Sequence, residues 1–403
     1  MTGTGLLAGS FDALWSALAP IGRHPATGGY RRYAWTAEDA ELRSWFVAEA
    51  AARELDVAED RAGNLWAWWG DPDAAGPGVV VGSHLDSVPD GGAFDGPLGV
   101  VSALVAVEVL RDRGFRPARP IGVVCFGDEE GARFGVPCAG SRLLTGALAP
   151  DAALALRDAD GTEYADARRA AGRHLAGLGP DPRALHRVGR FVELHVEQGR
   201  GLVDLGRAVA VGARIRPHGR WRFDLPGRAD HAGTTGLGDR DDPMLRLAAV
   251  VTAARSGAEA TGCLATVGRV AVEPNAVNAV PSRVRAWLDA RGDNELAIRR
   301  VVAQVAAAGG VPAVQESFTA ATSFDPALIA RLSGLLDDAP VLATGAGHDA
   351  GVLAAAGIPT AMLFVRNPTG ISHSPAEHVE RDDCLAGVDA LVRVVAELAG
   401  GTP

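Results

Sequence analysis

The sequence predicts an α/β domain that is interrupted by a smaller α+β insert. Two short apolar runs in the first half are typical of buried parallel strands. Helical patterns alternate with these runs, which favours βαβ units with helices on both faces of a sheet. The middle of the chain instead shows polar–apolar alternation, and the first pattern returns near the end. We therefore expect an α/β domain made of residues 1–207 and 323–403, with an α+β domain at residues 208–322 inserted into it.

Local signals place the individual elements. The first helix should begin after Thr36, a residue type that caps helices, because Glu38 and Asp39 then lie in its first turn. A second helix has a proline near its start and Gly114 just past its end. The insert reads strand, helix, strand, strand, helix, strand, the order of a ferredoxin-like sandwich. The expected elements are strands at 78–82, 121–126, 220–225, 263–272, 283–290 and 360–365 and helices at 36–53, 97–113, 244–255 and 295–307.

Composition and charge exclude several classes of protein. The 403 residues carry a net charge of −10 and are 47% hydrophobic, as in a folded acidic protein. Basic residues cluster only in pairs and near-pairs, so a nucleic-acid partner is not expected. No apolar stretch reaches the roughly 18 residues of a membrane helix, and no basic leader precedes Arg23. With four scattered cysteines, we expect a cytoplasmic protein without a membrane partner.

The first polar motif follows the strand expected at 78–82. His84 stands in Gly82-Ser-His-Leu-Asp-Ser-Val-Pro89, and ligands of open α/β sheets bind beyond the carboxyl ends of the strands. Asp86 is placed to accept a hydrogen bond from the second ring nitrogen, which would fix the tautomer of a metal-bound His84. A His–Asp pair in an ordinary loop is the alternative.

Carboxylates occur in two further glycine-rich motifs. Asp95 lies in Gly91-Gly-Ala-Phe-Asp-Gly-Pro-Leu-Gly99, where it would either cap the following helix or bridge two cations. Gly127-Asp-Glu-Glu-Gly131 follows the second buried strand and contains Glu129 and Glu130. Adjacent glutamates point in different directions, so one can bind a metal while the other serves as general base. The alternative is a solvated acidic turn, but buried neighbouring carboxylates would need cations to compensate their charge.

Two histidines complete a set of ligands. His195 lies in Leu194-His-Val-Glu-Gln-Gly199 after a strand-like stretch, and His373 lies in Ser372-His-Ser-Pro-Ala-Glu377 after the apolar run at 360–365. Either histidine alone would suit a structural role. Together the motifs offer three imidazoles and two carboxylates. A single catalytic zinc needs three protein ligands, so five ligands with one bridging carboxylate indicate a two-metal hydrolase.

These motifs resemble those of the dinuclear-zinc amidohydrolase/carboxypeptidase superfamily, which has an M20-type metallopeptidase fold. Within it, the chain is similar to the allantoate amidohydrolase and N-carbamoyl-L-amino acid hydrolase branch. The similarity runs from Asp60-Arg-Ala-Gly-Asn64 to Ser372-His373, and the motif around His195 is specific to that branch. The resemblance implies a metallopeptidase-like α/β domain with a lid and dimerisation insert, and a homodimer. We expect the insert to close about hinges near 206–212 and 320–323.

The resemblance also implies a role for each ligand. Glu129 would be the general base. The cations, two per subunit, would be zinc, manganese or cobalt, all of which suit imidazole and carboxylate ligands. One cation would be bound by His84, Asp95 and His195, and the other by Asp95, Glu130 and His373.

The insert carries residues that resemble the family's substrate-binding set. His231, in Gly227-Arg-Ala-Asp-His-Ala-Gly-Thr-Thr235, would polarise the scissile carbonyl in its own subunit or in the partner subunit. Arg291 would hold the substrate carboxylate through its guanidinium fork. Further candidates for substrate contact are Gln198, Arg240, Asn278, Gly347 and His348. The chain departs from the family's usual residues at Asp230, Gly236, Leu237 and Ser282, which leaves the substrate undefined.

The implied reaction is hydrolysis of the ureido or carbamoyl C–N bond of a small carboxylate substrate by a water that bridges two metals. A related dinuclear-zinc peptidase or N-acyl amino acid deacylase would use the same ligands. A nucleotide-binding oxidoreductase is a third hypothesis, because Gly345-x-Gly347-x-x-Ala350 follows an apolar run and precedes a helix. Arg366 and Asn367, about 20 residues further on, offer no acidic ligand for a ribose, which argues against it.

Overall fold

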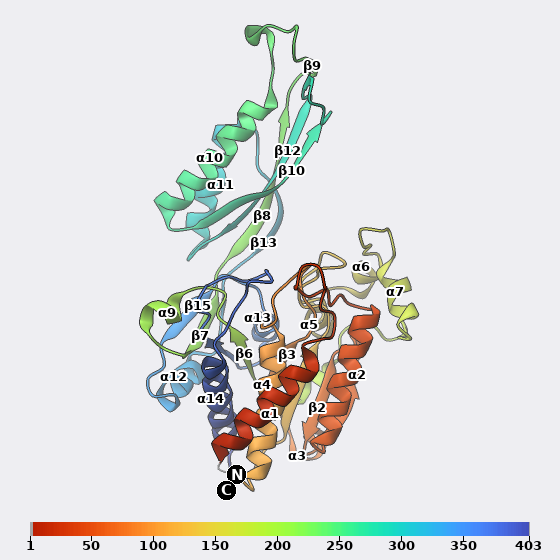
Figure 1. Ribbon diagram of the computed structural model, residues 1–403, viewed down its shortest axis with the longest axis vertical. Coiled ribbons are helices and arrows are strands. Elements are labelled where there is room, and N and C mark those ends of the chain that lie inside the picture. The colour runs from red at the N-terminus through yellow and green to blue at the C-terminus, as the bar shows by residue number, and fades with distance from the viewer. Residues whose placement is uncertain (1–2, 403) are drawn as a thin grey trace. The chain divides into compact units, whose positions relative to one another are not determined.

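The computed structural model describes residues 3–402, and the chain divides into two compact units. Unit 1 comprises the residues up to Arg214 together with those from Ser323 onward, and unit 2 comprises Ile215–Thr322. Figure 1 traces the chain, with unit 2 in green to cyan. Each unit has a hydrophobic core of its own.

Unit 1 is built on a mixed β-sheet. Among residues 3–402, nine strands join it in the order β1-β2-β5-β3-β6-β16-β7-β14, with β15 paired to β7. The central strands β5, β3, β6 and β16 run parallel to one another, so their carboxyl ends meet at one edge. The predicted α/β class is confirmed. The strands are β1 (Asp56–Glu59), β2 (Leu65–Trp69), β3 (Gly78–His84), β5 (Ile121–Phe126), β6 (Val188–Val196), β7 (Val209–Ile215), β14 (Thr322–Ser323), β15 (Val341–Thr344) and β16 (Thr360–Val365).

Helices cover both faces of this sheet. α4 (Pro97–Asp112) packs on β3, β5 and β6, and α1 (Gly3–Leu18) and α14 (Arg381–Ala399) pack against α4. On β6, Leu194 joins the core under α4, whereas Glu193 accepts a hydrogen bond from the first turn of α13 (Asp349–Ala355). Neighbouring residues of a strand point to opposite faces, so α13 lies on the other face. The remaining elements of unit 1 are α2 (Ala37–Ala52), α3 (Pro72–Ala75), β4 (Arg116–Pro117), α5 (Ala139–Thr145), α6 (Pro150–Leu154), α7 (Tyr164–Ala170), α8 (Pro182–His186), α9 (Gly201–Leu205), α12 (Pro326–Leu335) and β17 (Gly401–Thr402).

Local sequence explains where the principal elements begin and end. Thr36 caps α2 by accepting a hydrogen bond from the backbone of Asp39 at 3.4 Å. α4 starts at Pro97, directly after Gly96, whose φ of 85° suits glycine. All residues of β3 are buried, as expected of a strand that is covered on both faces. Within residues 3–402, no helix is both long and apolar enough to cross a bilayer.

Unit 2 is a four-stranded antiparallel sheet with two helices. Its strand order is β10-β12-β8-β13, as in a ferredoxin-like sandwich. Buried and exposed residues alternate along β8 and β12, and α10 and α11 pack on the buried face. The elements are β8 (His218–Pro226), β9 (Asp230–His231), a 3₁₀ turn at Leu237–Asp239, α10 (Pro243–Thr261), β10 (Leu264–Glu273), β11 (Ala279–Val280), β12 (Arg283–Arg291), α11 (Glu295–Gly309) and β13 (Val314–Thr319).

The chain leaves and re-enters unit 1 at neighbouring strands. β14 lies next to β7 in the sheet, and the backbone N–H of Phe324 donates to the oxygen of Ala213 at 3.0 Å. Residues 208–214, which the sequence assigned to the insert, extend the sheet of unit 1 because β7 pairs with β16. The hinge expected near 206–212 therefore falls largely within a hydrogen-bonded strand.

Candidate metal centre

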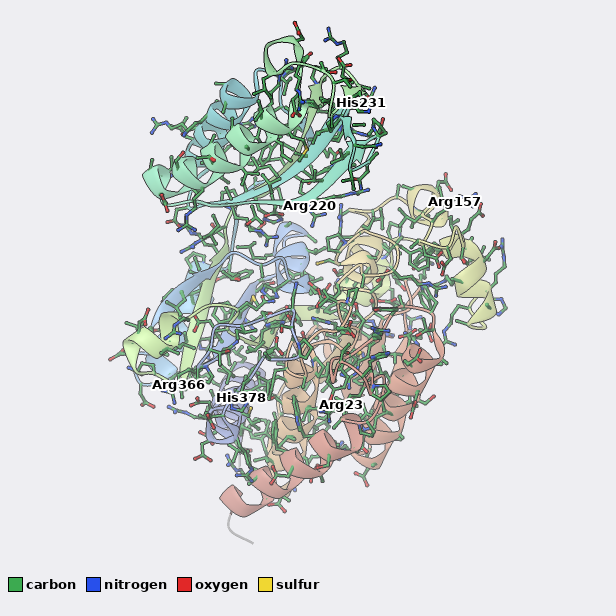
Figure 2. All side chains as sticks on the ribbon, turned by 45° about the horizontal axis from the view of Figure 1, so that its top comes forward. Arg23, Arg157, Arg220, His231, Arg366 and His378 are labelled. Carbon is green, nitrogen blue, oxygen red and sulfur yellow. The ribbon has the colours of Figure 1, made fainter. Side chains whose placement is uncertain are left out.

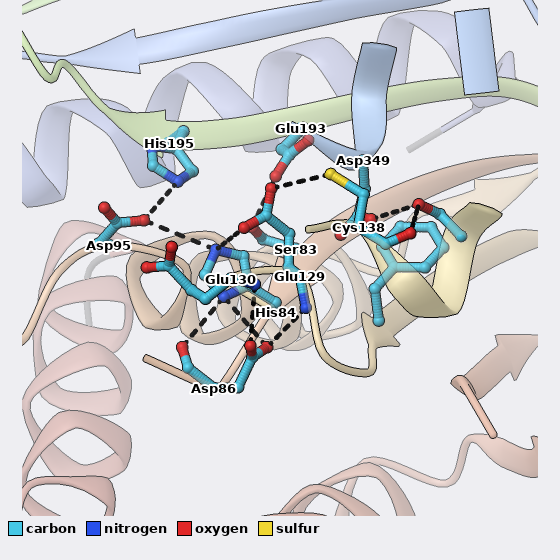
Figure 3. A network of polar contacts seen from close by, with 12 residues as sticks. Ser83, His84, Asp86, Asp95, Glu129, Glu130, Cys138, Glu193, His195 and Asp349 are labelled. Atoms are coloured by element: carbon cyan, nitrogen blue, oxygen red, sulfur yellow. Dashed lines mark hydrogen bonds and ion pairs between the residues drawn. The ribbon is translucent and has the colours of Figure 1, made fainter. Parts of the chain in front are cut away.

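The predicted ligands come from the carboxyl ends of the parallel strands. His84 is the last residue of β3, and His195 is the last but one of β6. Glu130 lies in the loop after β5, and His373 lies in the loop after β16. Asp95 lies just before α4, the helix that follows β3. Because these strands are adjacent and parallel, the five side chains approach one another, and four of them are drawn in Figure 3.

Asp95 lies at the centre of this cluster. Its Oδ1 is 3.1 Å from Nε2 of His195 and 3.6 Å from Nε2 of His84. Its Oδ2 is 3.5 Å from Nε2 of His373, which is also 3.6 Å from Oε2 of Glu130. The five residues thus form two groups that share Asp95, and within each group the ligand atoms lie within 4.8 Å of one another. One carboxylate therefore offers a different oxygen to each group.

The alternative role for Asp95, that of a helix cap, is wrong. The cap position of α4 is occupied by Gly96, and no side chain caps the helix. A Cβ at Gly96 would lie 2.4 Å from the imidazole of His84, so glycine is required for the ring to fit there. The backbone before α4 is thus shaped around the cluster.

The imidazoles of His84 and His195 are oriented as metal ligands would be. Nδ1 of His84 lies 3.1 Å from the backbone oxygen of Asp86, and Nδ1 of His195 lies 2.9 Å from that of Val196. Carbonyl oxygens only accept hydrogen bonds, so we place the proton of each ring on Nδ1. Both Nε2 atoms are then turned toward Asp95, and both are buried without a hydrogen-bond partner. A ring that gives up its Nε2 proton there offers a lone pair to a cation. Buried lone pairs beside carboxylates fit a divalent cation.

Negative charge accumulates in this cluster. Burial acts to lower the pKa of His84, but the carboxylates of Glu129, Asp86 and Asp95 outweigh it and raise that pKa well above its ordinary value. Burial raises the pKa of Glu129 well above its usual range. Burial, with the charge of Asp95, raises the pKa of Glu130 to about 7. Divalent cations would compensate this excess of buried carboxylates.

Glu129 lies beside the cluster but outside its ligand groups. Its side chain is buried, and Oε2 lies 3.8 Å from Nε2 of His84. Oε1 accepts a hydrogen bond from Sγ of Cys138 at 3.2 Å (Figure 3). The backbone N–H of Cys138 also donates to the carbonyl of Glu129 at 2.5 Å, so Cys138 holds this glutamate at two points. The alternative of a solvated acidic turn is wrong, because Asp128 and Glu129 are both buried.

Asp86 orients the glutamate pair as well as His84. Its carboxylate lies 3.4 Å from Nδ1 of His84, although its own backbone oxygen is the nearer partner of that nitrogen. Its two carboxylate oxygens accept the backbone N–H groups of Glu129 at 3.1 Å and of Glu130 at 3.0 Å. The sequence predicted only the contact with His84. Asp86 thus ties the loop after β5 to the end of β3.

Three side chains that the sequence analysis did not assign to the cluster contact Asp95. Nε2 of Gln198, expected to contact substrate, donates to Asp95 Oδ2 at 2.8 Å, and Oγ of Ser372 lies 3.2 Å from the same oxygen. Glu377 accepts the backbone N–H of Asp95 at 3.1 Å. Burial and the charge of Asp95 raise the pKa of Glu377 to about 7. Ser372 and Glu377 flank His373 in one motif, so the sequence did contain a signal for them.

His348 lies against the cluster at the start of α13. Its ring centroid is 4.5 Å from that of His195, and burial together with His195 lowers the pKa of His348 well below its ordinary value. Its Nε2 is buried without a hydrogen-bond partner. Gly347 is exposed in the turn before it. The segment that resembled a dinucleotide fingerprint therefore carries a neutral histidine of this cluster.

His231 and Asn278 lie close together in unit 2. His231, labelled in Figure 2, is exposed in β9, and its Nδ1 accepts the backbone N–H of Gly233 at 3.0 Å. The proton of this imidazole is therefore on Nε2. Asn278 is exposed just before β11, and its backbone oxygen accepts the N–H of Ala232 at 3.0 Å. The pairing of β9 with β11 thus keeps the two residues side by side.

The two predicted arginines of unit 2 make contacts within that unit. The guanidinium of Arg240 donates to the backbone oxygens of Ala232 at 2.6 Å and of Thr235 at 3.0 Å, which braces the loop that follows His231. Arg291 pairs with Asp289 on the same strand at 2.7 Å. Both guanidinium groups are partly buried.

Comparisons with known proteins identify the family. A sequence model of the peptidase family M20/M25/M40 matches residues 80–397, a span that contains the five predicted ligands. The chain belongs to this family. The resemblance inferred from the motifs is thereby confirmed, and the M20 assignment accounts for the α/β unit with an inserted domain.

Known proteins are similar to this chain over almost its whole length. The N-carbamoyl-L-amino acid amidohydrolase of Geobacillus stearothermophilus is 37% identical over 416 residues, which cover 97% of this chain and 99% of that protein. The allantoate amidohydrolase of Escherichia coli K12 is 31% identical, with 95% and 96% covered. The crystal structure of a hydantoinase/carbamoylase family amidase from Burkholderia ambifaria superposes with a TM-score of 0.82 at 30% identity, with 98% of each chain covered.

Proposed function

We propose that the chain is a metal-dependent amidohydrolase that cleaves the ureido or carbamoyl C–N bond of a small carboxylate substrate, such as allantoate or an N-carbamoyl-L-amino acid. The observation that carries this proposal is the placement of Asp95, which turns one oxygen to His84 and His195 and the other to His373. A shared carboxylate between two groups of ligands is the arrangement of a two-metal hydrolase. The names of the similar proteins support the choice of bond.

The cluster would hold two divalent cations of zinc, manganese or cobalt, all of which suit mixed imidazole and carboxylate ligands. Bound there, the cations would polarise the scissile carbonyl and acidify the attacking water. The residues of the first site are His84, Asp95 and His195, and those of the second are Asp95, Glu130 and His373.

Glu129 is the proposed general base. It belongs to none of the ligand groups, and the thiol of Cys138 engages only Oε1. Oε2, on the side of His84, is then free to take a proton from the attacking water and to pass it to the leaving nitrogen. Burial raises the pKa of this carboxyl, which makes it a stronger base toward the attacking water than an exposed glutamate.

Residues of unit 2 are proposed to bind the substrate. His231 carries its proton on the exposed Nε2, which suits a donor to the oxyanion that develops on the substrate carbonyl. Arg291, with Asn278, is the proposed anchor of the substrate carboxylate, because a guanidinium binds a carboxylate through two parallel hydrogen bonds. Gln198, Arg240, Gly347 and His348 remain proposed contacts to the rest of the substrate.

We also propose a cytoplasmic homodimer that associates through unit 2. Apolar side chains are exposed on α10 and on the edge strand β10, among them Leu245 at 73% and Leu264 at 67%. Exposed apolar side chains and an unpaired strand edge are features of association surfaces. The four cysteines are free buried thiols, which suits a reducing compartment.

A substrate panel tests the proposed reaction. Metal-free protein would be reconstituted with zinc, manganese or cobalt and supplied with allantoate, ureidoglycolate, N-carbamoyl-L-amino acids, N-acetyl-L-amino acids and dipeptides. We expect ammonia release from one or more of the ureido or carbamoyl compounds and little cleavage of the others. Preferred cleavage of dipeptides or of N-acetyl amino acids would contradict the proposal and favour a peptidase or a deacylase.

A further inference from the structure

Glu377 is a buried carboxylate that the proposed chemistry does not use. It stands four residues after His373, on the same loop, and its side chain is 5% exposed. A carboxylate buried close to Asp95 is unfavourable unless it makes compensating hydrogen bonds. Its contacts therefore show what it contributes.

Glu377 binds the backbone of the loop that carries Asp95. Its Oε1 accepts two backbone N–H groups, from Phe94 at 2.8 Å and from Asp95 itself at 3.1 Å. Two N–H donors on one carboxylate oxygen fix the loop in position and in direction. The two residues are 282 positions apart in the sequence, so the contact joins two segments that lie far apart along the chain.

Ser372 adds a second link between the same two loops. Its Oγ lies 3.3 Å from Oε2 of Glu377 and 3.2 Å from Oδ2 of Asp95. A hydroxyl carries one hydrogen, so it donates to one of the two carboxylates at a time. Ser372 thus lies between Glu377 and the Asp95 oxygen that faces His373.

Gly92 provides an independent observation. A Cβ at this position would lie 2.4 Å from Cβ of Glu377 and 2.5 Å from its Oε1. Any residue with a Cβ at position 92 would occupy the space of the Glu377 side chain. Only glycine therefore lets Glu377 reach the N–H groups of Phe94 and Asp95. The loop before α4 is therefore shaped around Glu377 as well as around His84.

We propose that Glu377 is a positioning residue that holds the His373 loop and the Asp95 loop in register, so that Asp95 Oδ2 and His373 face the same cation. This inference rests on the proposed two-metal function. It adds that the second ligand group, Asp95–Glu130–His373, depends on Glu377, whereas the first group, built on the strand residues His84 and His195, depends on it much less.

Cation binding by metal-free protein tests the inference without any substrate. Mn²⁺ or Zn²⁺ would be titrated in competition with a chromophoric chelator into the wild type, Glu377→Ala and Glu377→Gln. We expect Glu377→Ala to lower the affinity for the cation of the second group by about 10- to 100-fold. This is the usual loss when a residue that orients metal ligands is removed. The other cation should keep its affinity. Glu377→Gln should recover most of the loss, because its amide oxygen can accept the same two N–H groups.

Matched variants separate positioning from a general loss of structure. Glu380→Ala, three residues away and exposed, should bind both cations as the wild type does. Gly92→Ala should reproduce the loss seen in Glu377→Ala by displacing the carboxylate without removing it. If Glu377→Ala does not fold, Glu377→Asp, which is one methylene shorter, should show the same selective loss.

Wild-type affinity for both cations in Glu377→Ala or Glu377→Asp would overturn the inference. So would wild-type affinity for both cations in Gly92→Ala. An equal loss of affinity for the two cations in Glu377→Ala would overturn it as well. In steady-state assays on the preferred substrate, we expect kcat to fall in Glu377→Ala while KM stays near its wild-type value. Failure of the proposed reaction is distinguishable, because wild-type protein would then bind two cations and cleave none of the carbamoyl compounds.

Discussion

At the scale of single residues, the division of labour between Glu129 and Glu130 is the sharpest feature of the site. The two are adjacent in sequence, yet only Glu130 joins a ligand group, while Glu129 turns to Cys138 and toward His84. Asp86 enforces this difference by binding both backbone N–H groups. The pair can therefore be separated by mutation.

Glu129→Gln should keep both cations and lose activity. The amide preserves the shape of the side chain but cannot take up a proton, and loss of a general base typically costs about 10²- to 10⁴-fold in rate. Metal content by elemental analysis and kcat on the preferred substrate are the two measurements. Glu54→Gln, at a side chain that is 83% exposed, is the control. Retained turnover in Glu129→Gln would show that another group is the base.

Asp95→Asn and His373→Ala should differ in the number of cations they lose. Asp95 serves both groups, so its replacement should weaken both sites, whereas loss of His373 should empty only the second. Cations per chain would be counted by mass spectrometry after dialysis. His378→Ala, an exposed histidine on the same loop, should retain the wild-type number. Equal losses in Asp95→Asn and His373→Ala would argue against a bridging carboxylate.

At the scale of elements, the loop after β5 is held by Asn64. Its Oδ1 accepts the backbone N–H of Gly127 at 3.0 Å, and its Nδ2 donates to the oxygen of Gly140 at 3.2 Å and to Asp60 at 2.8 Å. Asn64 is fully buried. The loop that carries the glutamate pair is thus anchored at its start and at the helix that follows it.

Asn64→Ala should destabilise the protein by about 1–3 kcal/mol, the cost of a buried polar group left without its partner. Urea unfolding monitored by tryptophan fluorescence, with metal-free protein, measures this loss. Asn275→Ala, at an exposed position of unit 2, is the control and should change stability little. A loss in Asn64→Ala no larger than in the control would mean that the loop is held by its other contacts.

Much of the fold and of the site could be predicted from the sequence because the signals were local. His84, Glu130 and His195 each stand in or directly after an apolar run, and parallel strands must bring such positions to one edge. The motif around His373 marked Glu377 as a candidate, but its contact with backbone N–H groups 282 and 283 residues away could not be predicted from that motif. The start of the insert was expected at residue 208, several residues before the end of β7. Only the long-range pairing of β7 with β16 shows that residues 208–214 belong to the large sheet.

At the scale of the whole molecule, cation binding should contribute to stability. Carboxylates crowded in unit 1 repel one another without cations, and a ligand that binds only the folded state stabilises it by about 4 kcal/mol at a thousand times its Kd. We expect the melting temperature to fall with a chelator and to recover when Zn²⁺ or Mn²⁺ is restored. Asp95→Asn should show a much smaller response. If the melting temperature of the wild type does not change with the chelator, the cations do not contribute to its stability.

The association state is a second property of the whole molecule. Sedimentation velocity should give a dimer for the wild type, and a charged residue in place of Leu264 on the edge strand β10 should shift it toward monomer. Leu296→Glu, at another exposed apolar residue of unit 2 on α11, is the matched control and should stay dimeric. A wild type that sediments as a monomer at micromolar concentration, or a Leu264→Glu variant as dimeric as the control, would contradict association through β10.

The adjacency of β7 and β14 has a consequence for protein engineering. The chain leaves unit 1 at Arg214 and returns to it at Ser323 on the neighbouring strand. A short turn could therefore join these two positions directly. The shortened protein would keep Asp95 and the four histidine and glutamate side chains around it, because all five lie outside the excised stretch. Unit 2 could thus be replaced by another domain inserted at the same junction, which would change the substrate specificity while unit 1 stays the same.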